Sequence, residues 1–391
     1  MINREARGLV FPVIMLVGIG LLMVYSSSVF LSMAKFGNSF HYFWRHLFNI
    51  IIGFTALFLL SKVDYHQLRI LLWPLMIFSV LLLCMVFVPG IGMSAGAKSE
   101  VTRWINLRFF TFQPSELAKI SMVIFLSDYM SRNAHRIKSF LHGVAVPLAV
   151  MAGFQGIILL QPDFGAVISI GILSVTLLFI GGIRLKYIFG IVGVSAPVIG
   201  ILIYSASYRI ARLTCFINPW QDSQGCGYQL VQSFLAFGRG GLTGVGVGGS
   251  KQKLFFLPEA HNDFIFSLIG EETGFIGVLF VLGIFLYLMI RLFKMARLIE
   301  DPFGYYLAVG LTLMITSQAL INFAVTIGLM PTKGLPLPFI SYGGSALLMN
   351  MAAFGILISI SKSQGEAPLK RPPAISVRKQ STTNYNRRRY R

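Results

Sequence analysis

Long apolar runs separated by short polar segments dominate the pattern of this 391-residue chain. Each run is long enough, at roughly 20 residues, to cross a hydrocarbon core as an α-helix. The runs do not show the alternating polarity of strands in a membrane barrel. The pattern therefore predicts an all-α, polytopic integral membrane protein with about ten transmembrane helices, near residues 9–33, 44–61, 69–89, 113–131, 142–160, 163–183, 187–206, 263–291, 303–329 and 343–361.

The composition agrees with a protein that lies in a bilayer. Hydrophobic residues make up 55% of the chain, charged residues make up 12%, and the mean hydropathy is +0.73. Soluble domains carry about 25% charged residues. The first run follows Arg4 and Arg7, exceeds the apolar core of a signal peptide and precedes no small-x-small cleavage site. We therefore expect it to be retained as the first transmembrane helix.

The basic residues indicate how the chain is oriented. With the N-terminus inside, the short inner connections hold most of the loop lysines and arginines, as the positive-inside rule requires. Both termini are then cytoplasmic, and two longer loops, about 90–112 and 207–262, lie outside. The second is one long extracytoplasmic loop between the seventh and eighth helices. The basic residues of the inner connections are Lys62, Arg69, Arg132, Arg136, Lys138, Arg184, Lys186, Arg291, Lys294 and Arg297.

The net charge of +19 is densest after residue 361, in a segment that ends NYNRRRYR. This segment mixes basic residues with Pro, Ser and Asn and has no apolar periodicity, which is typical of disorder. We predict one membrane domain, 1–361, followed by a disordered basic cytoplasmic tail, 362–391. Such a tail more often sets orientation or contacts anionic membrane lipid than nucleic acid, so no nucleic-acid partner is expected.

A cluster of polar residues, LPEAHNDF at 257–264, precedes the eighth apolar run. Asp263 lies at the boundary of that run, where burial of a carboxylate is unfavourable. It can be interpreted as a helix N-cap, because an aspartate side chain accepts hydrogen bonds from the first free backbone N–H groups of a helix. It can equally be interpreted as a catalytic group, and the residue pattern alone does not separate the two.

The segment before this cluster, FGRGGLTGVGVGGSKQK at 237–253, is rich in glycine and ends with Lys251 and Lys253. Glycine-rich backbone can approach a phosphate group closely. A dinucleotide-binding fingerprint needs a strand before it and a helix after it, and this loop lies between membrane helices. We expect either a flexible outer loop that bends over a phosphate-bearing ligand or an ordinary mobile loop.

Ionisable residues also occur inside the predicted helices. Glu116 and Lys119 are one helical turn apart in the fourth run. Each charge alone would cost about 3 kcal/mol or more at the bilayer centre, so we predict an intramembrane ion pair. The pair can be structural or can take part in function. Glu271 and Glu272, in the eighth run, pose the same question.

Two further motifs interrupt the apolar pattern on the outer side. QPDFG at 161–165 joins the fifth and sixth helices, and PTKGLPLPFISYGGS at 331–345 joins the ninth and tenth. Their prolines and glycines disfavour regular helix, and such irregular backbone needs cover from protein or water. We expect loop turns or a lined cavity with Lys333, Ser341 and Tyr342 near the outer surface.

Two of the three cysteines, Cys215 and Cys226, share the long outer loop, whereas Cys84 lies in a helix. In an oxidising compartment the two could form a disulfide, which would add roughly 2–3 kcal/mol of stability. Two free thiols are the alternative.

Four motifs together resemble the SEDS family, named for shape, elongation, division and sporulation. They are RWINLRFFTFQPSELAKI, LLQPDFGA, GYQLVQSFLAFGRGGLTGVGVGGSKQKLFFLPEAHNDFIF and PTKGLPLPFISYGGSALL, in order from about residue 100 to 350. The wording is closer to the division members of the family than to the elongation members. The resemblance implies a ten-span peptidoglycan glycosyltransferase of the bacterial inner membrane that polymerises lipid II at the division septum and works with a class B penicillin-binding transpeptidase and other divisome membrane proteins. It also implies that Asp263 is the essential outer aspartate and that Glu116 and Lys119 form the family's ion pair.

The implied reaction makes a single aspartate sufficient. A sugar hydroxyl attacks an anomeric carbon and expels a polyprenyl diphosphate, so a carboxylate base is useful. The leaving group is already a good anion and needs positive charge instead of protonation. No tightly bound cofactor is expected. A divalent cation such as Mg²⁺ or Mn²⁺, with Asp263 as a ligand, could supply that charge, as could the basic residues Arg103, Arg212, Lys251, Lys253 and Lys333.

Two other functions remain open from the sequence. A lipid II flippase or other transporter would use Glu116, Lys119 and Glu271 as a relay through the bilayer. A non-catalytic division scaffold would use only apolar faces and the tail. The candidate groups gather at the outer face, which favours chemistry at the membrane surface.

Overall fold

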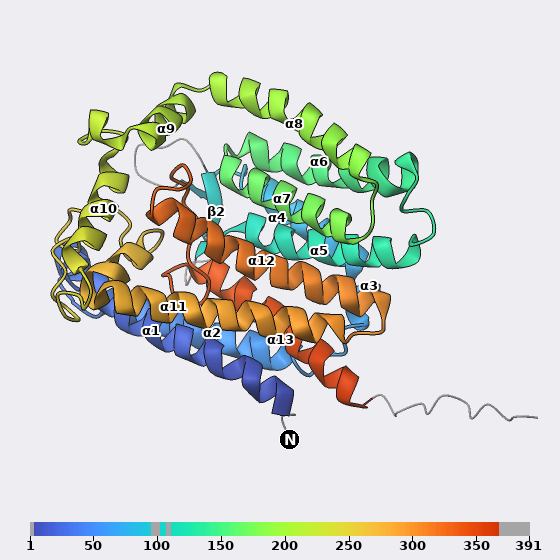
Figure 1. Ribbon diagram of the computed structural model, residues 1–391, viewed down its shortest axis with the longest axis horizontal. Helices are drawn as coiled ribbons and strands as arrows, with labels where there is room; N and C mark the ends of the chain where they lie inside the picture. Colours follow the sequence, from blue (N-terminus) through green and yellow to red (C-terminus); the bar gives the residue numbers. More distant parts are fainter. Residues whose placement is uncertain (1–3, 95–101, 107–110, 367–391) are drawn as a thin grey trace, which may run out of the picture.

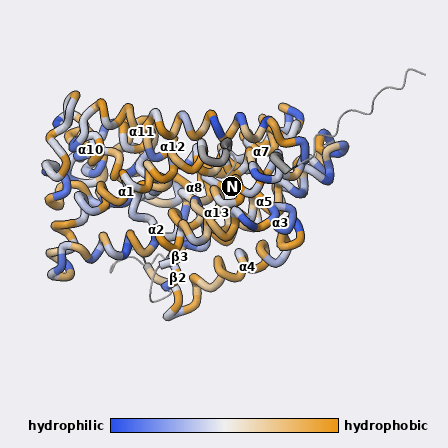
Figure 2. The backbone as a smooth tube through the Cα atoms, turned by 90° about the horizontal axis from the view of Figure 1, so that it is seen from below, coloured by the Kyte–Doolittle hydropathy of each residue, from blue (hydrophilic) through white to orange (hydrophobic). Residues whose placement is uncertain are grey.

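The computed structural model describes residues 4–94, 102–106 and 111–366. Long helices lie side by side along the longest axis of the molecule (Figure 1). Hydrophilic residues gather mainly toward the two ends of these helices, with apolar residues between them (Figure 2). This is the distribution expected of a bundle whose middle zone lies in hydrocarbon.

Each of the ten predicted runs forms a helix. The corresponding elements are α1 (Arg4–Phe36), α2 (His41–Leu60), α3 and α4 (Gln67–Ile70 and Leu72–Met85), α5 (Pro114–Arg132), a π-helical turn continued by α6 (Leu141–Ala145 and Val146–Leu160), α7 (Phe164–Ile180), α8 (Leu185–Tyr204), α11 (Ile265–Arg297), α12 (Pro302–Thr326) and α13 (Gly344–Glu366).

Length and polarity divide these helices into three groups. Among the described residues, seven helices are long and apolar enough to cross a membrane, and α4 and α7 are shorter apolar helices. The tenth, α5, carries Glu116, Lys119, Asp128 and Arg132, and most of its residues are buried inside the bundle. Burial within protein allows these charges to pair with protein partners instead of facing lipid.

The interior of the bundle is formed by α5, α12 and α13. The most apolar stretches of α12 and α13 are 78% and 83% buried. In contrast, α8 contains no buried residue and runs along the edge of the bundle (Figure 1). Helix α13 continues to Glu366, beyond the predicted boundary at 361, and the rest of the predicted tail, residues 367–391, lies outside the described part.

The two long segments that were predicted to lie outside contain regular structure that the sequence did not suggest. Between α8 and α11 lie α9 (Ser207–Ile217), a 3₁₀ turn (Pro219–Asp222) and α10 (Tyr228–Gly240). The segment before α5 forms a small antiparallel sheet with the order β1-β2-β3 (Gly92–Ser94, Thr102–Asn106 and Thr111–Phe112). The prediction of an all-α fold therefore holds for the membrane helices and misses this sheet.

The glycine-rich loop fills a break in α11. Gly274 has φ 67° and ψ −167°, which is not helical, so α11 consists of two helical segments. The break frees backbone groups, and the loop pairs with them: Val245 N–H donates to the Glu271 carbonyl at 3.0 Å, and Phe275 N–H donates to the Gly241 carbonyl at 2.9 Å. These bonds attach the loop to the break, where the freed backbone groups of the helix need such partners.

Candidate functional site

Asp263 lies at one end of the bundle, close to the motif between α12 and α13. The side-chain amide of Asn322 donates to the backbone carbonyls of Asp263 and Leu335, both at 2.8 Å. Asn322 lies 20 residues after Pro302, the first residue of α12. At 1.5 Å per residue this is about 30 Å, the thickness of a hydrocarbon core. Asn322, and Asp263 with it, therefore lies one hydrocarbon thickness away from the start of α12.

Ser341 and Tyr342 join the two motifs. The Ser341 hydroxyl donates to the Asn262 carbonyl at 2.6 Å and accepts from Leu337 N–H at 2.8 Å. The Tyr342 N–H donates to the His261 carbonyl at 3.0 Å. The Ser341 hydroxyl is thus engaged within the protein, whereas Tyr342 uses its backbone N–H for this bond, and both residues support the Asp263 segment. The Tyr342 ring packs in an aromatic cluster with Tyr42, His46 and His261.

The Asp263 carboxylate does not cap a helix. Helix α11 begins at Ile265, and the residue before it, Phe264, provides no side-chain cap. The Oδ1 atom of Asp263 is buried and has no hydrogen-bond partner within the described part of the chain. Its Oδ2 atom lies so close to Gly334 that a Cβ on that glycine would come within 2.9 Å. The N-cap interpretation is therefore wrong, and the carboxylate is free for chemistry.

The surroundings of Asp263 disfavour its charged form. Burial raises the pKa of this carboxyl from 3.8 to about 8, the neighbouring Glu259 also raises it, and Arg212 lowers it. A carboxylate with this pKa is a stronger base than a solvated aspartate, and its pKa lies near neutral pH.

This pKa predicts a pH-dependent effect on stability. Between pH 3.8 and about 8, the folded protein keeps a proton on Asp263 that the unfolded chain has released. The stability that protonated Asp263 contributes is therefore complete below the unfolded-state pKa of 3.8 and is lost as the pH rises through the folded-state pKa of about 8. Asp263→Asn cannot ionise, so its apparent Tm in detergent should exceed that of the parent by more at pH 8.5 than at pH 5.5. An equal difference at both pH values would contradict the raised pKa.

Arg103 and Lys333 extend the site toward the QPDFG turn. Arg103, on β2, donates to the carbonyls of Pro162 at 2.5 Å and Gln161 at 3.3 Å. Burial lowers the pKa of the Lys333 ammonium, whereas Asp163 acts in the opposite direction. Asp163 caps α7 by accepting from Ala166 N–H at 3.1 Å, and it accepts from the Gln113 amide at 3.1 Å. Arg103 thus binds backbone carbonyls, and Lys333 lies near a carboxylate.

Three residues of the site were not among the predicted candidates: Asp163, Asn322 and Gly334. Asp163 belongs to a motif that the sequence singled out, and Asn322 is a buried amide in an apolar helix, which is itself an unusual signal. Nothing in the sequence distinguishes Gly334 from the neighbouring turn residues.

The two loop lysines have different surroundings. Lys253 is buried, and its ammonium lies 3.3 Å from the Glu272 carboxylate and 2.5 Å from the Gly248 carbonyl. This pairing makes it unsuitable as an open phosphate ligand. Lys251 has an exposed side chain, and its backbone N–H donates to the Glu271 carboxylate at 3.0 Å. Glu271 also accepts from Arg239 at 3.3 Å and from the Ser250 hydroxyl. The two glutamates therefore anchor the loop.

Glu116 and Lys119 form an ion pair at 2.8 Å, and both residues are 4% exposed. Lys119 also lines a narrow pocket between α5, α7, α12 and the 331–343 segment. The Oε1 atom of Gln318, another lining residue, is buried without a hydrogen-bond partner among the described residues.

The geometry predicts strong coupling between Glu116 and Lys119. Removing one partner of a buried pair leaves an uncompensated charge and should destabilise the protein by roughly 3 kcal/mol. We expect Glu116→Gln and Lys119→Met each to lower the apparent Tm, and the double variant to lose less than the sum of the two. Strictly additive losses in this double-mutant cycle would show that the pair does not interact.

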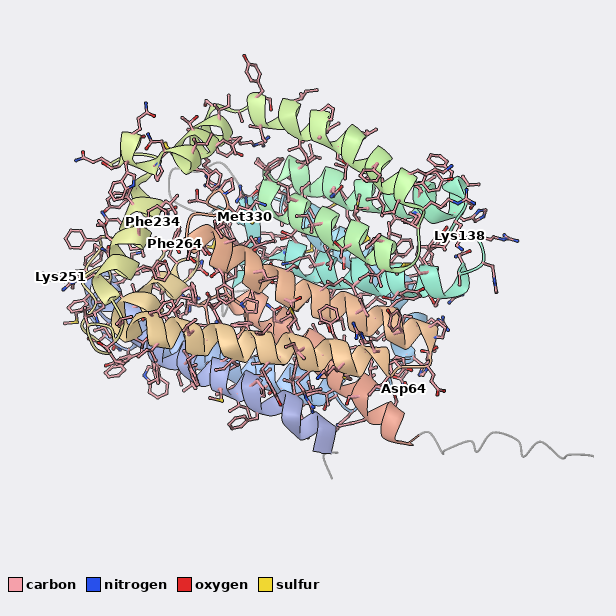
Figure 3. The ribbon with its side chains drawn as sticks, in the orientation of Figure 1. Asp64, Lys138, Phe234, Lys251, Phe264 and Met330 are labelled. Carbon is pink, nitrogen blue, oxygen red and sulfur yellow. A yellow bond between two sulfur atoms is a disulfide. The ribbon has the colours of Figure 1, made fainter. Side chains whose placement is uncertain are left out.

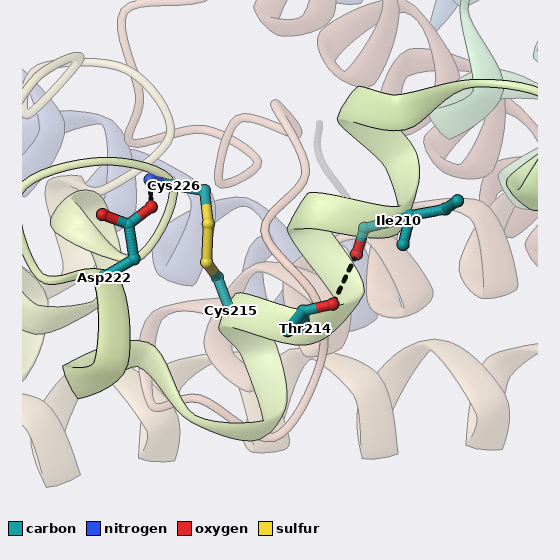
Figure 4. The surroundings of a disulfide bond; sticks show 5 residues. All are labelled: Ile210, Thr214, Cys215, Asp222 and Cys226. Atoms are coloured by element: carbon teal, nitrogen blue, oxygen red, sulfur yellow. Dashed lines mark hydrogen bonds between the residues drawn. A yellow bond between two sulfur atoms is a disulfide. The ribbon is translucent and has the colours of Figure 1, made fainter.

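Cys215 and Cys226 are joined by a disulfide that links α9 to the start of α10 (Figure 4). Asp222 lies beside the bridge and accepts from Cys226 N–H at 3.0 Å. These three residues form the one group in the described ranges with metal-ligand spacing, and the disulfide occupies both thiols. A cation at Asp263 would therefore take most of its ligands from substrate oxygens and water, a common arrangement for Mg²⁺.

Known proteins of similar sequence and structure agree with this architecture. Residues 7–366 match the model of a family described as cell cycle protein, FtsW/RodA/SpoVE. The chain is 41% identical over 349 residues to a "Probable peptidoglycan glycosyltransferase FtsW" of Geobacter metallireducens, covering 89% of this chain and 92% of the relative. A protein of the same name from Coxiella burnetii is 41% identical over 349 residues, covering 88% and 93%.

Two solved structures share the fold. A chain from the study "Structural coordination of polymerization and crosslinking by a peptidoglycan synthase complex" has a TM-score of 0.74 and 25% identity, covering 92% of this chain and 98% of that chain. The rod shape determining protein RodA of Thermus thermophilus has a TM-score of 0.66 and 25% identity, covering 91% and 96%. With the family model matching 360 residues (7–366), this multi-pass membrane protein belongs to the FtsW/RodA/SpoVE family of cell cycle proteins.

Proposed function

We propose that this protein is a peptidoglycan glycosyltransferase that polymerises lipid II at the outer face of the bacterial inner membrane during septal wall synthesis. The observation that carries the proposal is the Asp263 carboxylate, which has an unpartnered oxygen and a pKa of about 8 at the outer boundary of the bundle. The names of the relatives give the reaction class. The buried, unpartnered carboxylate supports a base at this end of the bundle.

Asp263 would act as the general base for glycan extension. The 4-hydroxyl of one sugar attacks the anomeric carbon of another, and its proton passes to the Asp263 carboxylate. A new glycosidic C–O bond forms while the bond to the diphosphate oxygen breaks. Undecaprenyl diphosphate leaves with the bonding electrons. A positioned base contributes typically 10²–10⁴-fold to the rate of such a step.

Positive charge near the leaving diphosphate would come from several places. Arg212 interacts electrostatically with Asp263, and Lys333 lies in the adjoining segment. A divalent cation bound by Asp263 and the diphosphate would stabilise the developing charge as a Lewis acid.

The charged residues support a transport relay less well than they support catalysis at Asp263. Glu271 accepts from Arg239, Ser250 and loop N–H groups, so its partners belong to the loop anchor. A relay through the bilayer would need carboxylates that can exchange partners along a path. The flippase and scaffold functions remain the alternatives that the assay below would bring forward.

A class B penicillin-binding transpeptidase is the partner that we propose, together with other septal membrane proteins. Support comes from the solved complex, whose title couples polymerisation with crosslinking, and which matches 92% of this chain. The test of function is formation of glycan strands from purified lipid II by this protein with its cognate transpeptidase. Lipid II transbilayer movement without any strand formation would favour the flippase instead.

The proposed orientation places both termini in the cytoplasm and residues 207–262 outside. Lys251 and Lys138 are exposed and lie at opposite ends of the molecule (Figure 3). Cysteine at position 251 should react with an impermeant thiol reagent in intact spheroplasts, and cysteine at 138 should react only after lysis, both in a Cys84→Ala background. The opposite labelling pattern would reverse the orientation. Ser250 is unsuitable as a probe position because it is buried.

A further inference from the structure

The segment that follows α10 exposes a row of large apolar side chains. The exposed fractions are 72% for Leu242, 70% for Val247, 39% for Leu254, 60% for Phe255 and 51% for Phe256. We call these five residues the apolar rim. Several large apolar side chains exposed in one short segment mark a candidate site of contact with a membrane or another molecule.

The depth of the rim can be measured along α1 and α11. These helices run antiparallel: Arg291 lies against Gly8, and Glu272 accepts a hydrogen bond from Ser26 at 2.6 Å. Eighteen residues separate Gly8 from Ser26. At 1.5 Å per residue this is about 27 Å, close to the hydrocarbon thickness of about 30 Å. Because Arg291 and the basic residues after it mark one boundary, Ser26 and Glu272 mark the other.

The rim lies at this second boundary. Lys253, immediately before Leu254, has its ammonium 3.3 Å from both the Ser26 hydroxyl and the Glu272 carboxylate. The same ammonium lies 6.0 Å from the centre of the Phe30 ring on α1. Lys253 therefore fixes the adjoining rim residues at the level where headgroups meet acyl chains.

The rim also continues the apolar outer surface of the neighbouring helices. The Leu242 carbonyl accepts from Ile276 N–H at 3.2 Å, so the two residues are neighbours. Ile276 is 63% exposed, and Phe275 and Leu279 beside it on α11 are 53% and 50% exposed. Phe30 on α1 is 43% exposed. Phe275, Ile276 and Leu279 follow Glu272 toward Arg291, so they lie on the hydrocarbon side of the boundary, where lipid or another membrane helix covers them.

The charge pattern of the segment indicates whether lipid or protein covers the apolar rim. Residues 241–258 contain no aspartate or glutamate. The ammonium of Lys253 is paired with Glu272, whereas the side chain of Lys251 is exposed at the margin of the rim. Aromatic side chains next to a free lysine, without acidic residues, are typical of segments that lie in the interface of a bilayer with anionic lipids.

We propose that the apolar rim is a membrane anchor that lies in the headgroup–acyl boundary of the outer leaflet. Phe255 and Phe256 insert among the lipids, and Lys251 reaches the lipid phosphates. This contact holds the 241–256 segment at a fixed depth, and the LPEAHND motif begins directly after it. The anchor would thus help to keep the Asp263 segment at the membrane surface, where a lipid-linked substrate would arrive.

Spin labels can test the depth of the rim in the full-length protein. Single cysteines at 255 or 256, in a Cys84→Ala background, are labelled and the protein is reconstituted in phosphatidylethanolamine–phosphatidylglycerol vesicles. Position 279 on α11 is the lipid-facing control, and position 38, in the exposed turn after α1, is the aqueous control. The quantity compared is the ratio of oxygen accessibility to the accessibility of a water-soluble nickel chelate. We expect this ratio to be several-fold higher for labels at 255 and 256 than for the label at 38.

Two results would overturn the anchor. A nickel accessibility at both 255 and 256 equal to that at 38 would mean that the rim faces water and is open to a soluble partner domain. Protection from both reagents would mean that protein, such as a second copy of this chain, covers the rim. Two independent label positions keep the test valid if one variant fails to fold.

Discussion

Asp263→Asn is expected to lower glycan-strand formation by at least 10²–10⁴-fold, the effect typical of removing a positioned base. Asparagine keeps the size and shape of the side chain but is neither charged nor basic. Because Oδ1 has no hydrogen-bond partner in the described part of the chain and the side chain caps no helix, few contacts are lost. The variant should therefore be folded and inactive. The loss should be larger if Asp263 also binds a divalent cation.

The measurement is polymerisation of purified lipid II with the transpeptidase partner present. Membrane abundance and co-purification with the partner serve as controls for folding and assembly. Ser341→Ala is a useful comparison, because Ser341 bonds two backbone groups near Asp263 without carrying a charge. It should lower stability more than it lowers the rate per folded molecule. Substantial polymerisation by Asp263→Asn would remove the catalytic role and favour a scaffold or flippase.

Gly274→Ala is expected to prevent accumulation of the folded protein. The backbone of Gly274 is in a region that is essentially restricted to glycine, and a non-glycine residue there costs of order 1–3 kcal/mol. A Cβ would also overlap the backbone nitrogen of Gly244 and come within 2.6 Å of the Leu242 carbonyl. The loop would have to leave the break in α11, and the backbone bonds between them would be lost. We expect a total destabilisation of about 3 kcal/mol or more.

Gly283→Ala provides a matched control in the same helix. A Cβ at Gly283 meets no atom within 4 Å, and alanine is the better helix former by about 1 kcal/mol. The measurement is the yield and apparent Tm of both variants in the same detergent. Equal behaviour of the two would show that the break in α11 is not required. A stable Gly274→Ala variant with a displaced loop would contradict the rigid anchoring described here.

Local sequence rules succeeded where one physical requirement dominates. A chain that crosses hydrocarbon must satisfy its backbone hydrogen bonds within each segment, so apolar runs locate most of the ten helices, while α5 carries charges and is buried within the bundle. The Glu116–Lys119 pair was predictable for the same reason, since one helical turn separates the two charges and neither is stable alone in the membrane. Local rules failed at Asp263, because α11 begins at Ile265, too late for that side chain to cap it.

The roles of the loop lysines and of the two glutamates could not be predicted from their neighbours in the sequence. Glu272 pairs with Lys253, 19 residues earlier, and accepts from Ser26, 246 residues earlier. The glycine-rich motif suggested a phosphate cradle, yet its backbone pairs with the broken helix. Signals of this kind are ambiguous because backbone N–H groups can bind either a phosphate or a free helix carbonyl.

The class of protein, the helical runs, the motifs that carry the family resemblance and the aspartate to examine can all be read from the order of residues along the chain. Which groups are available for chemistry depends on how the chain packs. This packing places Asp263 beside Gly334 with an unpartnered oxygen, and it pairs Lys253 with Glu272. Helix formation depends on residues within a few turns of one another. The availability of a charge depends on which distant segments satisfy it, and packing of the whole chain sets those partners.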